Sequence, residues 1–276
     1  MSTPLESTSR VLRYLRHGAF SRLPPGVITG LRAVGVGLLE AASLGRGRGV
    51  MAGGRYPLRV MWSRMAIDFT TLEQPFVLAF GATLQPGMTV FDVGASLGEW
   101  SALAATRTGP EHVHLFEPNA ESWPAIRGIF RRNGFASAGG VFPGFASAQD
   151  AQSASLLEPG ARRRWPPGRR GRIRFESLTE PGILPQVRLD TYAAATGVRP
   201  DVIKIDVEGA EGEVLRGAVG ILTHDRPIVF LSLHPWLLGP FGDTKDGLLG
   251  WLAARGYELQ LLGIDHEEHW ACHPRP

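Results

Sequence analysis

The sequence predicts an α/β fold, in which residues 71–276 form a mainly parallel sheet behind a basic, mainly helical extension of residues 1–70. From Thr71 onward, short β-branched runs alternate with stretches of helical periodicity, as is typical of a parallel sheet covered on both faces. Before Thr71 the apolar residues recur at helical spacing rather than in alternation. These two patterns divide the chain into an extension and one sheet domain.

Positive charge is concentrated in the extension. The first 80 residues hold ten arginines against four acidic residues, whereas the net charge of the whole chain is +3. Val11, Leu12 and Leu15 share one face of a predicted helix. Such an extension suits a lid, a homodimer contact or a contact with an acidic membrane, but a solvated packing arm is the simpler interpretation.

Composition indicates a cytoplasmic globular protein. Hydrophobic residues make up 43% of the 276 residues, enough for a sizeable core. Cys272 is the only cysteine, so an internal disulfide is impossible and a reducing compartment is expected. Charged residues interrupt the first apolar stretches, and Arg32 and Glu40 break the most apolar one. We therefore expect neither a signal peptide nor a transmembrane segment.

The predicted elements of the sheet domain follow in regular order. The first half comprises a strand at 88–93, a helix at 99–107, a strand at 112–116 and a helix that ends at 132. The second half comprises a strand at 202–207, a helix to about 222, a strand at 228–233, a helix at 245–255 and a terminal hairpin of residues 257–262 with those around Trp270.

An arginine-rich loop is predicted between these halves. Residues 161–174 contain seven arginines, from Arg162 to Arg174, around a Pro-Pro-Gly turn. Guanidinium groups suit phosphates or carboxylates, so an anionic substrate or a nucleic acid is one interpretation and a solvated insertion is the other. No recognition helix or aromatic base platform accompanies the charge, and we expect no specific nucleic-acid partner.

A glycine turn follows the first strand, in the segment Asp92-Val-Gly-Ala-Ser-Leu-Gly98. Gly94 permits close approach of a ligand, and Gly98 permits tight packing of strand against helix. A dinucleotide fold would carry glycine at the position of Ser96 and no acid at the turn. The carboxylate of Asp92 repels phosphates and suits a cationic ligand, such as an amino-acid ammonium or a sulfonium.

A second acid ends the next strand. Glu117 lies 25 residues after Asp92, close to the spacing at which an acid accepts hydrogen bonds from ribose hydroxyls in nucleoside-binding sheets. Pro118 keeps Glu117 extended. Together the two acids indicate an adenosine-type ligand without a pyrophosphate.

Three charged residues alternate along the third strand. Lys204, Asp206 and Glu208 share one side while the strand stays extended. Charges at such positions form either a structural ion network or a polar wall that binds substrate. Two carboxylates permit metal binding, but the sequence shows no clear further ligands, so no metal is predicted.

These motifs resemble the FkbM-type methyltransferases across roughly residues 85–235. The resemblance rests on the glycine turn, Phe116-Glu117-Pro118, Leu189-Asp190-Thr191 and, most specifically, Ile203-Lys-Ile-Asp-Val-Glu-Gly-Ala-Glu211 with Val214-Leu-Arg-Gly-Ala218. It implies a Rossmann-like class I methyltransferase sheet of seven strands, the last antiparallel, that binds S-adenosyl-L-methionine. By this resemblance Glu117 holds the ribose, and the residues near the amino-acid portion of the cofactor are Asp92, Gly94, Ala95, Ser96 and Gly98.

The sequence departs from the family after the next strand. Where the family often has Glu-x-His, this chain has Ser232-Leu233-His234. His234 is a candidate general base for an acceptor hydroxyl, and a hydrogen-bonded structural histidine is the equal alternative. Asp206 is the second candidate, as base or as the group that orients the acceptor.

We therefore expect O-methylation of a small acceptor, such as a sugar or a glycosylated natural product. Two other functions remain as alternatives at this stage. An NAD-dependent oxidoreductase would share the sheet, but Asp92 and the missing middle glycine argue against it. A noncatalytic protein that binds anionic membrane or nucleic acid would use the two basic regions.

Overall fold

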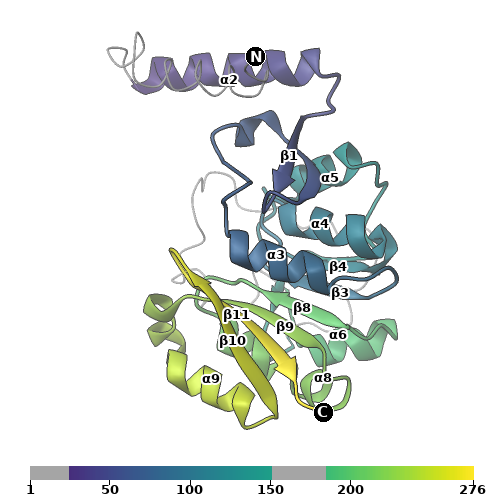
Figure 1. Cartoon of the computed structure of the whole chain (residues 1–276), viewed down its shortest axis with the longest axis vertical. Helices are drawn as coiled ribbons and strands as arrows, with labels where there is room; N and C mark the ends of the chain where they lie inside the picture. The colour runs from purple at the N-terminus through teal and green to yellow at the C-terminus, as the bar shows by residue number, and fades with distance from the viewer. Residues whose placement is uncertain (1–24, 151–184) are drawn as a thin grey trace.

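A mixed sheet of seven strands forms the centre of the computed structural model, which describes residues 25–150 and 185–276 (Figure 1). The strand order is β10-β11-β9-β8-β3-β4-β5. β11 runs antiparallel to β9 and β10, while the pairs among β9, β8, β3, β4 and β5 are parallel. The strands are β3 (Val90–Val93), β4 (Val113–Phe116), β5 (Gly140–Phe142), β8 (Val202–Ile205), β9 (Ile228–Leu233), β10 (Tyr257–Ile264) and β11 (Glu268–Pro274). The predicted fold class, including the antiparallel last strand, is confirmed.

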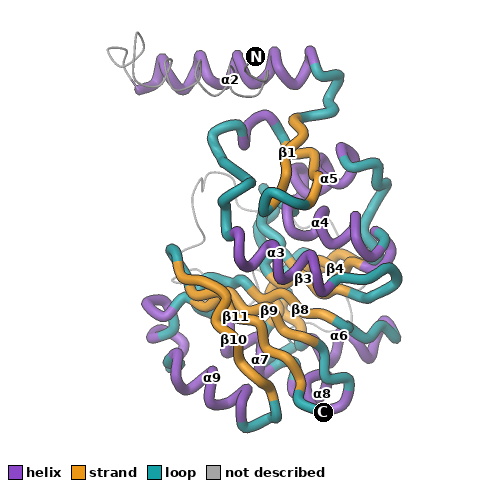
Figure 2. Tube along the Cα trace, in the orientation of Figure 1, coloured by secondary structure: helices purple, strands orange, loops and turns teal. Residues whose placement is uncertain are grey.

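Helices cover both faces of this sheet, as Figure 2 shows. One core lies under α3, α4 and α5, and the other lies under α6 to α9. Successive strand residues alternate between these cores: Val202 faces the first and Ile203 the second. The helices are α3 (Gln74–Thr83), α4 (Glu99–Thr108), α5 (Trp123–Arg132), α6 (Leu189–Thr196), α7 (Glu211–Arg216), α8 (Val219–His224) and α9 (Lys245–Ala253). Short 3-10 turns occur at η1 (Trp62–Arg64), η2 (Pro110–His112), η4 (Pro235–Leu237) and η5 (Gly239–Phe241).

The strand boundaries differ from the prediction at several places, since β3 begins at Val90 rather than at 88 and β10 extends to Ile264 rather than to 262. His112 ends the turn η2, so β4 begins one residue later than expected. β8 ends at Ile205 instead of continuing to 207, because Glu208 and Gly209 have φ values of 56° and 105° and turn the chain. The predicted terminal hairpin is confirmed as β10 and β11.

The extension contains a β-hairpin that the helical prediction missed. β1 (Arg48–Ala52) and β2 (Tyr56–Val60) pair antiparallel across a turn that contains Gly53 and Gly54. Leu58 and Val60 are buried in the same core as α4 and α5. This hairpin is therefore part of the core of the sheet domain.

A separate short pair of strands, β6 (Phe145–Ala146) with β7 (Gln186–Val187), lies outside the main sheet.

The helix α2 (Pro25–Ala42) lies apart from the sheet (Figure 1). Near its end, Glu40 accepts a hydrogen bond from the backbone of Trp62 and pairs with Arg132 of α5 at 2.9 Å. Neither α2 nor another helix in the described ranges has the length and apolarity needed to cross a bilayer. The predicted helix around Val11 to Leu15 and the arginine-rich loop lie outside the described residues.

Two leucines before Thr71 test whether the hairpin belongs to the core while α2 does not. Leu58 is 2% exposed and Leu38 of α2 is 66% exposed. We expect Leu58→Ala to lower the free energy of unfolding by about 2–5 kcal/mol, because it leaves a cavity in the core. The matched Leu38→Ala should change it by about 0.5 kcal/mol or less. Chemical denaturation measures both, and equal effects would contradict the packing described.

Candidate active site

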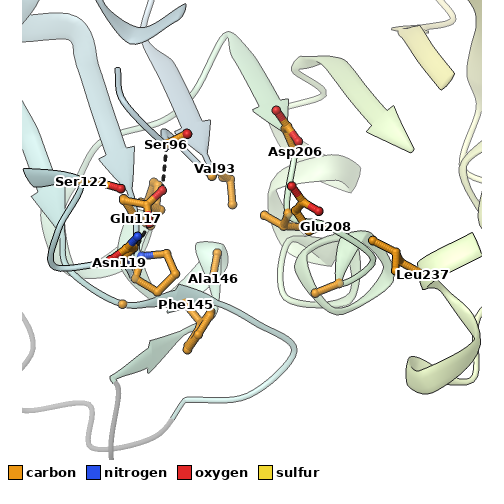
Figure 3. Close-up of a pocket in the computed structure, with 16 residues that line it drawn as sticks. Val93, Ser96, Glu117, Asn119, Ser122, Phe145, Ala146, Asp206, Glu208 and Leu237 are labelled. Carbon is orange, nitrogen blue, oxygen red and sulfur yellow. Dashed lines mark hydrogen bonds between the residues drawn. The ribbon is translucent and has the colours of Figure 1, made fainter. Parts of the chain in front are cut away.

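A cavity of about 450 Å³ opens beyond the carboxyl ends of β3, β4 and β8. Ligands of open parallel sheets bind at such a position, and the volume suits a small molecule. Figure 3 shows Glu117 on one wall and both Asp206 and Glu208 on the opposite wall. The other lining residues are Val93, Gly94, Ser96, Phe116, Pro118, Asn119, Ser122, Gly144, Phe145, Ala146, Val207, Ala210 and Leu237.

The glycine turn after β3 forms the floor of this cavity. Gly94 has a φ of +82°, and a Cβ there would lie 1.8 Å from the carbonyl oxygen of Asp206. Its backbone N–H donates to Phe116, and the N–H of Asp206 donates to Val93. The turn is thus tied to both neighbouring strands, and only glycine fits at 94. Ala95 is buried behind the turn, and Gly98 begins α4.

Glu117 is held in place by two backbone donors. Its Oε2 accepts from the N–H of Ser96 and its Oε1 from the N–H of Asn119, both at 2.7 Å (Figure 3). Burial raises the pKa of Glu117 to about 7, although these two hydrogen bonds oppose the increase. Each carboxylate oxygen keeps a lone pair free. The side chain is therefore oriented to accept two further hydrogen bonds from a ligand.

Asp92 and Lys204 lie opposite each other on β3 and β8, beneath the turn. The Nζ atom of Lys204 is 3.2 Å from Asp92 and 3.3 Å from Asp206, and it donates to the carbonyl of Gly94 at 3.1 Å. Ser101 donates to the second oxygen of Asp92. Burial alone would lower the pKa of Lys204, but the two carboxylates raise it. Both side chains are buried, and neither lines the cavity.

The three charged residues predicted to share one side of the strand therefore lie in two different environments. Of the three charged residues, Asp206 and Glu208 line the cavity, whereas Lys204 belongs to the ion network below it. Contact of Lys204 or Asp92 with a ligand stays a prediction. In this structure the two side chains lie beneath the glycine turn and support it. Ser122 and Asn119 also line the cavity and were missed, although Asn119 follows Glu117 by two residues.

His234 is enclosed by two carboxylates rather than open to the cavity. Its Nδ1 is 2.8 Å from Oε1 of Glu211, and its Nε2 is 2.8 Å from Oε2 of Glu267. Burial would lower the pKa of His234, but the two carboxylates outweigh it and raise the pKa to about 10. Both ring nitrogens therefore face carboxylates in this arrangement. The role of His234 as general base stays a prediction, and Asp206, which lines the cavity, is the other candidate.

Glu267 is the residue of this region that sequence reasoning had no means to find. It lies in the turn between β10 and β11, 33 residues after His234, and it is 2% exposed. Glu73, just before α3, was also missed; Trp100 donates to it at 3.0 Å. Only the folded sheet brings these acids next to Asp206.

Comparison with known proteins gives one family match. The model of the methyltransferase FkbM domain matches residues 92–259, more than half of the chain. No curated protein matches the chain.

Several solved structures resemble this one at low sequence identity. A methyltransferase FkbM from Methylobacillus flagellatus KT has a TM-score of 0.46 and 18% identity, over 68% of this chain and 44% of that one. A ribosomal protein L11 methylase from Lactobacillus delbrueckii subsp. bulgaricus has a TM-score of 0.45 and 14% identity, over 76% and 81%. Magnesium protoporphyrin IX methyltransferase from Synechocystis PCC 6803 with bound SAM has a TM-score of 0.42 and 11% identity, over 75% and 81%. The chain thus spans less than half the length of the Methylobacillus protein.

The buried ion network predicts a rescue experiment. Lys204→Met leaves Asp92 ionised in the core without its cation, and we expect a loss of about 3–5 kcal/mol in the free energy of unfolding. Adding Asp92→Asn removes the uncompensated charge and should recover a large part of that loss. Urea denaturation of both single variants and the double variant tests this coupling. A double variant no more stable than Lys204→Met alone would refute it.

Proposed function

Because this chain belongs to the FkbM methyltransferase family, we propose that it transfers a methyl group from S-adenosylmethionine to a hydroxyl group of a small polyhydroxylated acceptor. A sugar or a glycosylated natural product is the acceptor class that we favour. The observation that carries this proposal is the pair of carboxylates, Asp206 and Glu208, that faces Glu117 across the cavity.

The residues around the cavity fit S-adenosylmethionine. Glu117 has lone pairs free for the two vicinal hydroxyls of a ribose, and the backbone turn of Gly94 to Ser96 approaches the cavity without bulky side chains. We assign Ala95 and Gly98 to the support of this turn. When bound, the cofactor supplies a methyl group activated by a positive sulfonium. The acidic surroundings of the cavity favour such a positive ligand.

Asp206 and Glu208 favour a hydroxylated acceptor. Ionised carboxylates only accept hydrogen bonds, so they suit a ligand that offers several O–H donors. The Oδ2 atom of Asp206 is engaged by Lys204, which fixes the side chain and leaves its other oxygen for the acceptor. We assign to Asp206 the orientation of the reacting hydroxyl and the acceptance of its proton, and to Glu208 the binding of a neighbouring hydroxyl.

Methyl transfer is an in-line displacement, so the contribution of the protein is alignment and exclusion of water. The floor formed by Gly94 and the wall formed by Glu117 fix one reactant, and the opposite wall fixes the other.

Location and assembly extend the proposal beyond the site. We keep the cytoplasm as the compartment, because the lone Cys272 has no partner for an internal disulfide. Dimer formation through the extension also stays a prediction; the described part of α2 exposes Val34 and Leu38.

Cofactor binding is expected to depend on the ionisation of Glu117. With a pKa of about 7 in the free protein, Glu117 loses its negative charge as the pH falls, and a protonated carboxyl accepts ribose hydroxyls poorly. Titration calorimetry with S-adenosylhomocysteine should show binding about tenfold weaker at about pH 6 than at about pH 8. Glu117→Gln should bind weakly at both pH values. Equal affinity of the wild-type protein at the two pH values would contradict this role.

Methyl transfer is expected to depend on Asp206 more than on Glu208. A panel of sugars and glycosides, assayed by release of S-adenosylhomocysteine, identifies a working acceptor. With that acceptor, Asp206→Asn should lower kcat by about 10²–10⁴-fold, because the reacting hydroxyl loses its proton acceptor. The matched Glu208→Gln should mainly raise KM. Unchanged kcat in Asp206→Asn would remove Asp206 from the chemistry, and the absence of turnover with every hydroxylated acceptor would refute the proposed substrate class.

A further inference from the structure

A second group of polar side chains lies directly behind Asp206. Donor atoms of Asp206, His234 and Glu267 all lie within 4.8 Å of one another. These residues come from three neighbouring places in the sheet: the end of β8, the end of β9 and the turn before β11. Because β8, β9 and β11 are adjacent, their ends bring the three side chains to one point.

The histidine is oriented by a residue outside this group. Glu211 has no exposed surface, and its Oε1 contacts Nδ1 of His234 at 2.8 Å. The same oxygen accepts from the N–H of Gly209, which fixes the carboxylate. A carboxylate on one ring nitrogen that leaves the other directed at a shared point is the usual support of a metal-binding histidine.

Glu267 adds a second buried negative charge beside His234 at this point. Its Oε2 forms an ion pair with Nε2 of His234 at 2.8 Å and has no further partner in the described residues. The side chain is 97% buried. Two buried carboxylates, Glu211 and Glu267, share the one imidazole ring, so a further positive charge at this point would balance them.

We propose that Asp206, His234 and Glu267 bind a divalent metal ion of the Mn²⁺ type. One imidazole nitrogen and two carboxylate oxygens are a donor set that such ions accept, with coordination positions left for water or another oxygen ligand. The ion replaces the proton on Nε2 and balances the negative charge of Asp206, Glu211 and Glu267. Lys204, the nearest buried cation, is already paired with Asp92 and Asp206.

Two other groups in the described residues have metal-like spacing, and both contain Glu267. One adds Glu73 and His266, and the other adds Asp265 and His269. Each of these two groups includes an exposed side chain, His266 at 65% and Asp265 at 40%. Neither group contains a residue that lines the cavity. The group with Asp206 is more enclosed and is the one that reaches a substrate.

The position of the ion gives it a role in the reaction. Asp206 lines the cavity, so an acceptor oxygen beside it lies near an open coordination position. A metal-bound hydroxyl releases its proton more readily, and Asp206 accepts that proton as in the proposed function. The oxygen lone pair then forms the bond to the methyl carbon, while the carbon–sulfur bond breaks and its electron pair stays on sulfur. This role rests on the proposed O-methylation, whereas binding of the ion does not.

The experiment is a titration of the full-length, chelator-treated protein with Mn²⁺ alone, followed by electron paramagnetic resonance of the free ion. We expect one site whose affinity falls more than about tenfold in Asp206→Asn, His234→Gln and Glu267→Gln. Glu211→Gln should weaken it about 10–100-fold, as removal of an orienting carboxylate does. The matched His266→Gln should bind as the wild-type protein does.

Three outcomes would overturn the site. The first is that no Mn²⁺ binds at millimolar concentration, and the second is that all variants bind it with equal affinity. The third is that His266→Gln or His269→Gln loses Mn²⁺ binding while His234→Gln retains it. Circular dichroism checks folding, and Glu267→Gln decides the result if His234→Gln does not fold. Binding of S-adenosylhomocysteine without metal is measured in parallel. If S-adenosylhomocysteine does not bind, the proposed function is refuted but the ion site is not. If a chelator leaves methyl transfer unaffected, only the catalytic role of the ion is refuted.

Discussion

The ammonium group of Lys204 joins the two halves of the candidate site. It lies between Asp92 on β3 and Asp206 beyond β8, and it also holds the carbonyl of Gly94. One buried cation thus fixes both the floor of the cavity and the wall that faces Glu117. Register enforces this arrangement, because a shift of β8 by one residue would put Ile203 or Ile205 against Asp92 and bury the ammonium in the opposite, apolar core.

Two electrostatic environments meet at Asp206. Below the glycine turn, positive and negative groups are closely matched, which lets Asp92 and Lys204 remain buried. Beyond β9, the acids Glu211 and Glu267 enclose the single ring of His234. The first environment gives rigidity and the second leaves negative potential next to the cavity. A sulfonium cofactor is positively charged, so its site benefits from both.

The sequence predicted the sheet because its signals are local. Buried β-branched runs, the turn at Gly94 and Gly98 and the strand-end Glu117 each depend on a few consecutive residues. The extension was misread in part, since the Gly53-Gly54 turn between two alternating runs is a hairpin signal that the helical pattern around it obscured. The positions of Lys204 and His234 were found, but not their surroundings. Their partners come from strands paired across the sheet, and no local pattern specifies that Glu267 meets His234.

The place of β11 has a consequence for how the sheet is completed during folding. This strand follows β10 in the sequence, yet it lies between β9 and β10 in the sheet. Until residues 268–274 are in place, β9 has an unpaired apolar edge and β10 has no neighbour in the sheet. Unpaired edges of this kind are where nascent chains associate wrongly. Closure of this side of the sheet therefore depends on the seven residues of β11 entering between β9 and β10.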